Sequence, residues 1–382
     1  MQRLKLYLPW ILLSILLMFF VVYSLLSDGY YGGTDNVAHY LFSHYAFRHP
    51  ELFLHSWARP VYTIFSAPFA RFGFPGIRLF NVLAGLATAM LCYRIAGLLG
   101  IRHPWLAIIL VCFTPLYFLM IPTALTEIVF SLVFALTCFL FLRGNFIASA
   151  IVISFLPFAR SEGYIFLPVF FLIFLYFRRY KAIPFLATGM IVLTLIGLPH
   201  YKDVLWLIDQ FPYPVFGHHP TYTQKGSLWH FLEGRKEILG FPMEMLFIAG
   251  TIVIIRGCFS REKSVRDRAF LLGMLALAPF LIYLAFHSLL YWKALGGSMG
   301  LGRVMAAMLP MAAVVCLKGV EGLEEVFSFS RTGRYIFLGA VLILVVRAGV
   351  AGAPFPYHPG PEDACITKAS EWFRKSPYQN RK

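Results

Sequence analysis

The sequence contains few charged residues, and this scarcity limits the kind of protein that it encodes. Only 13% of the 382 residues are Asp, Glu, Lys or Arg, whereas 59% are hydrophobic and 17% are aromatic. A soluble globular domain carries about 25% charged and about 45–50% apolar residues. The composition therefore excludes an ordinary soluble enzyme and a disordered chain, and it predicts a protein that crosses a membrane several times.

The sequence also offers neither paired cysteines nor the pattern expected of a cleavable leader. The six cysteines form no C-x-x-C pair and most lie within apolar runs, which argues against a disulfide framework or a zinc site. The first apolar run, residues 7–26, is longer than a signal-peptide core of roughly 7–15 residues, and no A-x-A-like cleavage site follows it. We interpret this run as the first membrane span.

The apolar runs predict an all-α polytopic membrane protein. A span needs about 20 apolar residues to cross a hydrocarbon core of roughly 30 Å, and this criterion gives about 11 transmembrane helices. They begin near Tyr7, Pro75, Pro104, Ala124, Asn145, Gly163, Ile183, Pro242, Ala269, Met299 and Tyr335. We expect one transmembrane domain, residues 1–352, with two long outer loops at about 27–74 and 199–241 that contain short interfacial helices, and an outer C-terminal tail, residues 353–382.

The distribution of basic residues predicts the orientation. With a cytoplasmic N-terminus, five connections between spans face the cytoplasm, and all of them are basic. They lie near Arg102, near Arg143, and at residues 178–181, 256–268 and 318–334. The net charge of +15 then reflects topology and implies no nucleic-acid partner. We predict a multi-pass protein of the plasma (inner) membrane whose long loops and chemistry lie on the extracytoplasmic side.

Four ionisable side chains interrupt the predicted spans near their outer ends: Glu127, Arg160, Glu162 and Arg303. A charge at the centre of a span costs about 2.5–3.5 kcal/mol, so such residues mark a site or a polar cavity. The hairpin that carries Arg160 and Glu162 has arms of only about 15 residues, which reach about 22 Å of the roughly 30 Å needed. The tip is therefore expected at the floor of a hydrated outer cavity. The alternative is that the two residues only pair with each other or with a neighbouring helix.

The first outer loop contains a short amphipathic segment. Val37, Leu41 and Tyr45 recur at the spacing of a helix and predict a short helix that lies on the membrane. Asp35 and His39 are one turn apart on the same side of this helix. Taken alone, Asp35 would be explained by a favourable interaction of its charge with the helix dipole.

Four segments resemble motifs of the GT-C superfamily of integral-membrane glycosyltransferases. The superfamily includes protein O-mannosyltransferases, aminoarabinose transferases of lipid A and mannosyltransferases of lipid-linked glycan assembly. Residues 35–40 (DNVAHY) are similar to the acidic motif of the first outer loop, with Asn36 where many members have a second acid. Residues 57–62 (WARPVY), 159–163 (ARSEG) and 302–310 (GRVMAAMLP) resemble the W-x-x-R-P-x-Y, A-R-P-E-G and late R-Y/F-x-x-P segments.

The resemblance implies a GT-C-like fold and an inverting transfer of a sugar, by a hexosyl- or mannosyltransferase-like enzyme of cell-envelope glycosylation. The donor would be a polyprenyl-phosphate sugar, and the acceptor a hydroxyl of a lipid, glycan or protein on the extracytoplasmic face. A carboxylate that takes the acceptor proton contributes about 10²–10⁴-fold, and this role falls to Asp35. The lipid phosphate would be bound by Arg59, Arg160 and Arg303, since arginine offers two parallel hydrogen bonds and stays charged. Supporting or sugar-binding roles fall to His39, Tyr40, Glu127 and Glu162.

Other interpretations remain open at the level of sequence. Some GT-C members use a divalent metal, for which Asp35 and His39 are the candidate ligands; no other cofactor is implied. A multi-pass transporter of a lipid-linked or anionic substrate also needs a polar cavity, although this sequence shows no internal repeat and its intramembrane charges lie toward one face. A glycan polymerase or ligase would share the cavity.

Overall fold

The structure is a computed structural model, and every regular element in the part of the chain that it describes is helical. A stretch of the second long loop, residues 212–222, and most of the tail lie outside the described residues. The described residues are 2–211, 223–353, 356–358, 368, 369, 372, 375 and 376.

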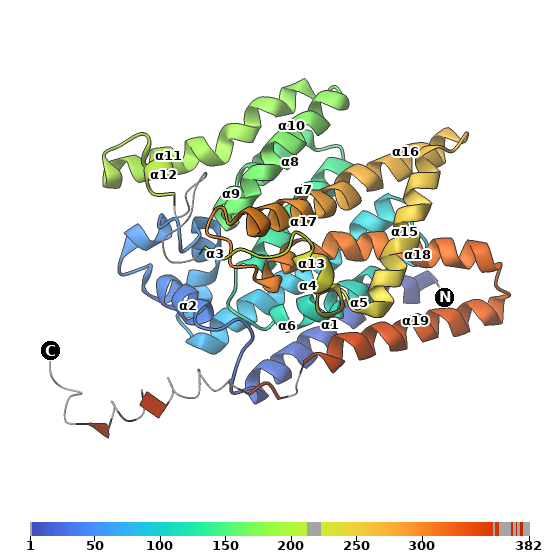
Figure 1. Cartoon of the computed structure of the whole chain (residues 1–382), viewed down its shortest axis with the longest axis horizontal. Coiled ribbons are helices and arrows are strands. Elements are labelled where there is room, and N and C mark those ends of the chain that lie inside the picture. The colour runs from blue at the N-terminus through green and yellow to red at the C-terminus, as the bar shows by residue number, and fades with distance from the viewer. Residues whose placement is uncertain are drawn as a thin grey trace.

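Figure 1 shows the arrangement of the helices. In chain order they are α1 (Gln2–Leu26), α2 (Asp35–Tyr45), η1 (Pro50–Phe53), α3 (Pro60–Ala70), α4 (Phe74–Leu98), α5 (Leu106–Cys112), α6 (Pro115–Met120), α7 (Glu127–Leu142), α8 (Phe146–Ser154), α9 (Leu156–Ala159), η2 (Ser161–Ile165), α10 (Phe166–Tyr176), η3 (Tyr180–Ala187), α11 (Thr188–Tyr201), α12 (Trp206–Asp209), α13 (His230–Glu233), α14 (Arg235–Ile238), α15 (Phe241–Cys258), α16 (Lys263–Leu272), η4 (Gly273–Leu277), α17 (Ala278–Lys293), η5 (Gly302–Met308), α18 (Leu309–Phe327) and α19 (Arg331–Ala351).

Seven helical segments of the described chain are long and apolar enough to cross a membrane, and three shorter apolar helices accompany them. Each of the predicted starting points falls in or beside a helix, so the all-α polytopic prediction is confirmed. Two boundaries differ from the prediction. The span expected from Pro104 is divided into α5 and α6 at Pro115, which begins α6 because proline has no N–H to donate to the preceding turn. The span expected from Ala269 begins at Lys263, since its charged first turns are helical too.

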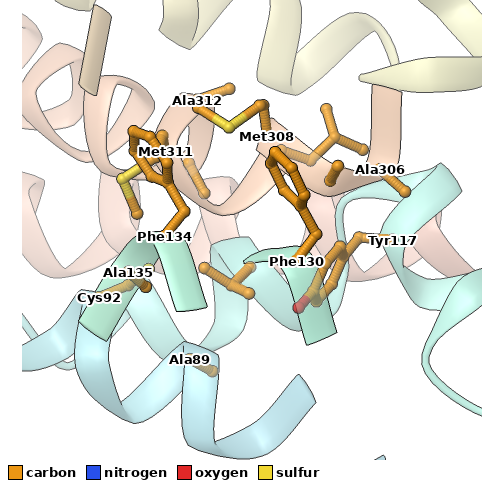
Figure 2. Packing of buried hydrophobic residues seen from close by; sticks show 14 of the residues in the cluster. Ala89, Cys92, Tyr117, Phe130, Phe134, Ala135, Ala306, Met308, Met311 and Ala312 are labelled. Carbon is orange, nitrogen blue, oxygen red and sulfur yellow. The ribbon is translucent and has the colours of Figure 1, made fainter. Parts of the chain in front are cut away.

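The segment formed by η5 and α18 lies at the centre of the protein. In Gly302–Phe327, 89% of the apolar window is buried, compared with 22% in Tyr7–Leu26 and in Arg331–Ala351. It packs against α4, α5, α7 and α15. Figure 2 shows the aromatic side chains of α7 against Met308 and Met311 of this segment. The segment that carries Arg303 is therefore held on several sides before any site is formed.

Small residues bring α15 and α18 close together. A Cβ atom added to Gly250 would lie 2.0 Å from the carbonyl oxygen of Val315, and one added to Gly319 would lie 2.0 Å from that of Leu246. In a membrane, lipid is as apolar as leucine, so helices associate through close packing of this kind. These glycines fix the position of α18 against its neighbour.

The short hairpin and the surface helix both match their predictions. The arms Phe146–Ala159 and Ser161–Tyr176 fall among the apolar helices of 10–17 residues, and Arg160 is the extended residue between them. In α2, the apolar side chains Val37, Leu41 and Tyr45 are exposed, as expected for a helix that lies on a membrane. The opposite, polar face of α2 is buried against α3.

Candidate functional site

A cavity of about 900 Å³ lies where the start of α2, the start of α7, the hairpin tip and η5 meet. Most of its lining is apolar, including Leu207, Ile208 and Phe231. Its ionisable lining residues are Asp35, His39, Arg59, Glu127, Arg160, Glu162, His287 and Arg303. These side chains come from segments far apart in the sequence, so the convergence expected from the polar residues of the spans is present.

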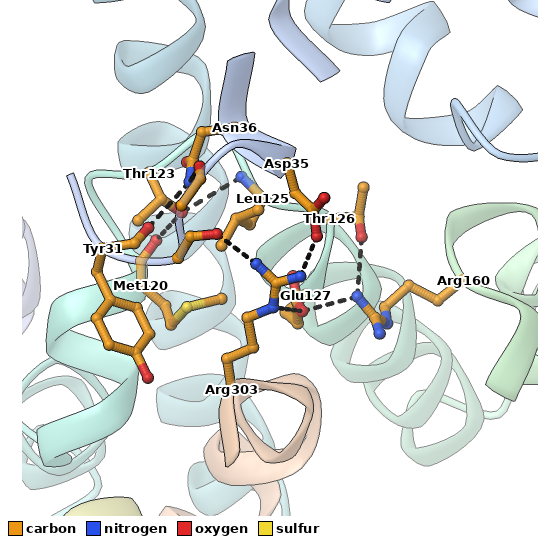
Figure 3. Close-up of polar contacts among 12 residues, drawn as sticks. Tyr31, Asp35, Asn36, Met120, Thr123, Leu125, Thr126, Glu127, Arg160 and Arg303 are labelled. Atoms are coloured by element: carbon orange, nitrogen blue, oxygen red, sulfur yellow. Dashed lines mark hydrogen bonds and ion pairs between the residues drawn. The ribbon is translucent and has the colours of Figure 1, made fainter. Parts of the chain in front are cut away.

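Arg303 lies between two carboxylates (Figure 3). Its guanidinium forms an ion pair with Asp35 and donates a hydrogen bond from Nη1 to the carbonyl oxygen of Gly32 at 2.6 Å. Its Nε lies 3.9 Å from Oε1 of Glu127. Asp35 begins α2 and Glu127 begins α7, so both acids sit where a helix N-terminus favours negative charge.

Arg160 is held by the two glutamates of the cavity. Its Nη1 lies 2.7 Å from Oε1 of Glu127, and its Nη2 lies 2.8 Å from Oε1 of Glu162. Nη1 also donates to the hydroxyl of Thr126 at 3.1 Å. Only 1% of the Glu127 side chain is exposed, so its charge is balanced by the arginines rather than by solvent. The charges at the hairpin tip are therefore paired, and the same side chains line the cavity.

Arg59 reaches the cavity from an unusual backbone conformation. Its φ of 66° lies in the left-handed region that non-glycine residues rarely adopt, and it directly precedes Pro60 at the start of α3. The side chain is buried, lines the cavity and donates from Nη1 to the carbonyl oxygen of Ser56 at 3.4 Å. Such backbone strain clusters at functional sites.

The remaining residues of the acidic motif have different positions. The His39 ring stacks on Trp57, with 5.1 Å between ring centroids, and both residues line the cavity. Tyr40 packs against Phe74 and is not among the cavity-lining residues. Asn36 is fully buried: its amide nitrogen donates to two carbonyl oxygens of its own loop, and its Oδ1 accepts a hydrogen bond from the N–H of Ala124 at 2.8 Å. A carboxylate at this position would lose the two donated bonds, which explains why an amide suits this chain.

Burial and charge keep the imidazole of His39 neutral. Desolvation, followed by the positive charges of Arg59, Arg160 and Arg303, lowers its pKa from 6.5 to about 3.

No group of three or more His, Cys, Asp or Glu side chains in the described part of the chain is arranged to hold a metal ion. Asp35 is paired with Arg303.

Two features of the cavity escaped the sequence-based predictions. His287 of α17 lines the cavity 3.9 Å from Glu162, and it is not among the site residues predicted from the sequence. Residues 295–301 also line the cavity, and the backbone there is left-handed at Gly296, Gly297 and Gly300. A histidine inside an apolar span and a glycine-rich run directly before Arg303 were the available signals.

No protein-family model matches the sequence, and a search of the curated proteins finds no match. Two solved structures do match the fold. The crystal structure of ArnT from Cupriavidus metallidurans in the apo state has a TM-score of 0.59 at 16% identity and covers 90% of this chain and 74% of that one. ArnT from the same organism bound to undecaprenyl phosphate has a TM-score of 0.58 at 14% identity and covers 96% of this chain and 72% of that one.

The chain has the same fold as ArnT. The match covers 96% of the chain, so the GT-C-like fold expected from four short motifs is confirmed. At this level of identity the likeness shows the fold alone, and the chemistry depends on the residues that line the cavity of this chain.

Proposed function

We propose that the protein is an inverting glycosyltransferase that moves a sugar from a polyprenyl-phosphate donor to an acceptor hydroxyl. One observation carries the proposal: three arginines and three acids converge on a cavity whose other walls are mainly apolar. This combination suits a ligand with an anionic head, a polar ring and a hydrocarbon tail. A structure with the same fold holds undecaprenyl phosphate, a ligand of this class without the sugar.

The donor phosphate is assigned to Arg303 and Arg59. Arg160 already contacts two carboxylates at 2.7 and 2.8 Å, whereas Arg303 pairs with Asp35 and has Glu127 only at 3.9 Å. Arg59 is buried and lines the same cavity. The lining residue Ile208 is also 65% exposed on the outer surface of α12, beside the exposed Leu205. The cavity is thus continuous with an apolar surface along which an isoprenoid chain can extend into lipid.

Asp35 is assigned as the base. The acceptor oxygen attacks the anomeric carbon, the bond from that carbon to the phosphate oxygen breaks, and the departing electron pair stays on the phosphate. The acceptor proton passes to Asp35, and Arg303 stabilises the charge that develops on the phosphate. In the unliganded protein Asp35 is paired with Arg303. A donor phosphate that binds Arg303 competes with Asp35, so donor binding frees the carboxylate to accept a proton.

The glutamates and Arg160 act as a support for this site. Oε1 of Glu127 contacts Arg160 and lies near Arg303, so one buried carboxylate orients both guanidinium groups. Glu162 contacts Arg160 from the other side. His39, held neutral against Trp57, forms part of the wall beside Asp35 without adding charge.

The proposal also includes a placement in the cell. We assign residues 1–352 to a single transmembrane domain with a cytoplasmic N-terminus in the inner membrane, and the cavity to the extracytoplasmic face. The basic connections between the spans support this orientation.

A reconstitution assay tests the function. Purified protein in liposomes is incubated with radiolabelled polyprenyl-phosphate sugars and envelope extracts as acceptors. The proposal expects label in a new acceptor product together with release of polyprenyl phosphate. Accumulation of intact labelled lipid or sugar across the bilayer, without cleavage of the glycosyl–phosphate bond, would contradict it and favour a transporter.

A further inference from the structure

Glu162 and His287 form a second polar corner of the cavity. Nε2 of His287 lies 3.9 Å from Oε1 of Glu162, which is too long for a hydrogen bond. Only 7% of the His287 side chain and 14% of the Glu162 side chain are exposed. Within the described part of the chain, the buried Nε2 of His287 and Oε2 of Glu162 have no hydrogen-bond partner. Buried polar atoms are almost always paired, so a polar ligand atom is expected here.

The 3.9 Å separation of His287 Nε2 and Glu162 Oε1 matches that of two groups that share one hydroxyl. An oxygen placed about 2.8 Å from Nε2 and from Oε1 forms two hydrogen bonds of normal length. A hydroxyl can donate to the carboxylate and accept from the imidazole N–H at the same time. A phosphate suits this corner less well, because the Glu162 carboxylate would repel it and the arginine in direct contact with Glu162, Arg160, also contacts Glu127.

This corner lies within reach of a sugar attached to the donor phosphate. Contacts of 2.8 Å from Glu162 to Arg160, 2.7 Å from Arg160 to Glu127 and 3.9 Å from Glu127 to Arg303 connect it to the phosphate side. The ring of Tyr283, 4.5 Å from that of His287 between centroids, fixes the orientation of the imidazole. Apolar walls with a few fixed polar groups are typical of sites that orient one ligand.

We propose that Glu162 and His287 together bind one ring hydroxyl of the donor sugar, which makes His287 a specificity-determining residue. The inference rests on the proposed function, because it takes the ligand to be a polyprenyl-phosphate sugar. The enzyme then discriminates among sugars by one hydroxyl. The residues that discriminate lie on α17 and at the hairpin tip, away from Asp35.

Binding measurements on the full chain in nanodiscs test this inference. Affinities are measured without acceptor for undecaprenyl phosphate and for a panel of undecaprenyl-phosphate hexoses and pentoses, followed by single-deoxy analogues of the tightest ligand. We expect one deoxy analogue to bind the wild type more weakly by on the order of 10- to 100-fold. His287→Ala should weaken binding of the parent sugar lipid by a similar factor and remove the penalty of that deoxy analogue.

The controls separate this inference from a folding defect and from the function itself. His287→Ala should bind undecaprenyl phosphate like the wild type, His287→Gln should restore part of the sugar dependence, and Leu289→Ala, on the same cavity wall, should leave the deoxy penalty unchanged. Sugar lipids that bind no tighter than undecaprenyl phosphate, or an unchanged deoxy penalty in His287→Ala, would overturn the hydroxyl site alone. A wild type that binds no undecaprenyl phosphate would overturn the proposed function and this inference with it.

Discussion

Two clusters of charged side chains lie at opposite ends of Gly302–Phe327, and only one of them borders the cavity. We call Asp35, Glu127, Arg160, Glu162 and Arg303 the cavity cluster and Arg102, His103, Glu321, Glu324 and Arg334 the closed cluster. In the closed cluster, Nε2 of His103 lies 3.2 Å from Oε1 of Glu324, and the N–H of Arg102 donates to Glu321 at 3.1 Å. None of its members is a cavity-lining residue.

The comparison shows that buried charge alone does not mark a site. Glu324 and Glu127 are equally buried, with 0% and 1% of their side chains exposed. The closed cluster links the α4–α5 connection to the end of α18 and to α19, through Arg102, His103 and Arg334. Its carboxylates therefore hold helix ends together, whereas those of the cavity cluster border space for a ligand. Changes in the closed cluster should lower stability, and changes in the cavity cluster should lower activity.

The largest expected effect is that of Asp35→Asn. An amide cannot take the acceptor proton, so kcat/KM should fall by about 10²–10⁴-fold. The variant should bind undecaprenyl phosphate at least as tightly as the wild type, because Arg303 no longer has a competing carboxylate. Transfer assays and lipid-binding measurements on the same preparation check both effects. Near-wild-type turnover in the folded variant would rule out Asp35 as the base.

Glu127→Gln and Glu324→Gln form a matched pair that tests the comparison directly. Glu127→Gln should weaken the alignment of Arg160 and Arg303 and lower kcat/KM by on the order of 10-fold, since a charge-assisted hydrogen bond contributes about 1.5–3 kcal/mol. Glu324→Gln should lower the thermal stability while the specific activity of the folded protein stays unchanged. Equal losses of kcat/KM and of thermal stability in both variants would show that the two clusters have the same role.

Gly319→Ala tests whether the helix between the two clusters depends on close packing. The added methyl group would overlap the Leu246 carbonyl oxygen, and overpacking of this kind typically costs about 1–3 kcal/mol of unfolding free energy. Gly339→Ala in α19 is the control, because an added Cβ there meets no atom within 4 Å. Thermal unfolding in detergent should separate the two variants, and equal melting temperatures would argue against the proposed contact.

The smallest expected effect concerns pH. The pKa of His39 is about 3 in the folded protein and about 6.5 for an ordinary imidazole, so below pH 6.5 the unfolded chain binds the extra proton. Stability should therefore fall by at most about 1.4 kcal/mol from this group as the pH is lowered by one unit from 6.5. His39→Phe, which keeps an aromatic ring against Trp57, should show a shallower decline. Identical pH profiles would remove His39 as the cause.

The sequence predicted the fold better than it predicted the individual contacts. Run length and basic connections located the helices, because the bilayer imposes both rules on every span. The short arms around Arg160 also predicted a cavity at the tip of the hairpin, and Arg160 and Glu162 line one. Periodicity could not show that Arg303 pairs with Asp35, because that contact joins residues 268 positions apart. The role of Asn36 depends equally on tertiary contacts, since its Oδ1 accepts from Ala124, 88 positions away.

The most direct test of the account is an experimental structure of the protein with undecaprenyl phosphate. The account predicts phosphate density in contact with the Arg303 guanidinium, near Arg59, with the Asp35 carboxylate released from Arg303. Density for the lipid phosphate at a different place, with the Asp35–Arg303 pair intact, would contradict the assignment of the cavity as the donor site.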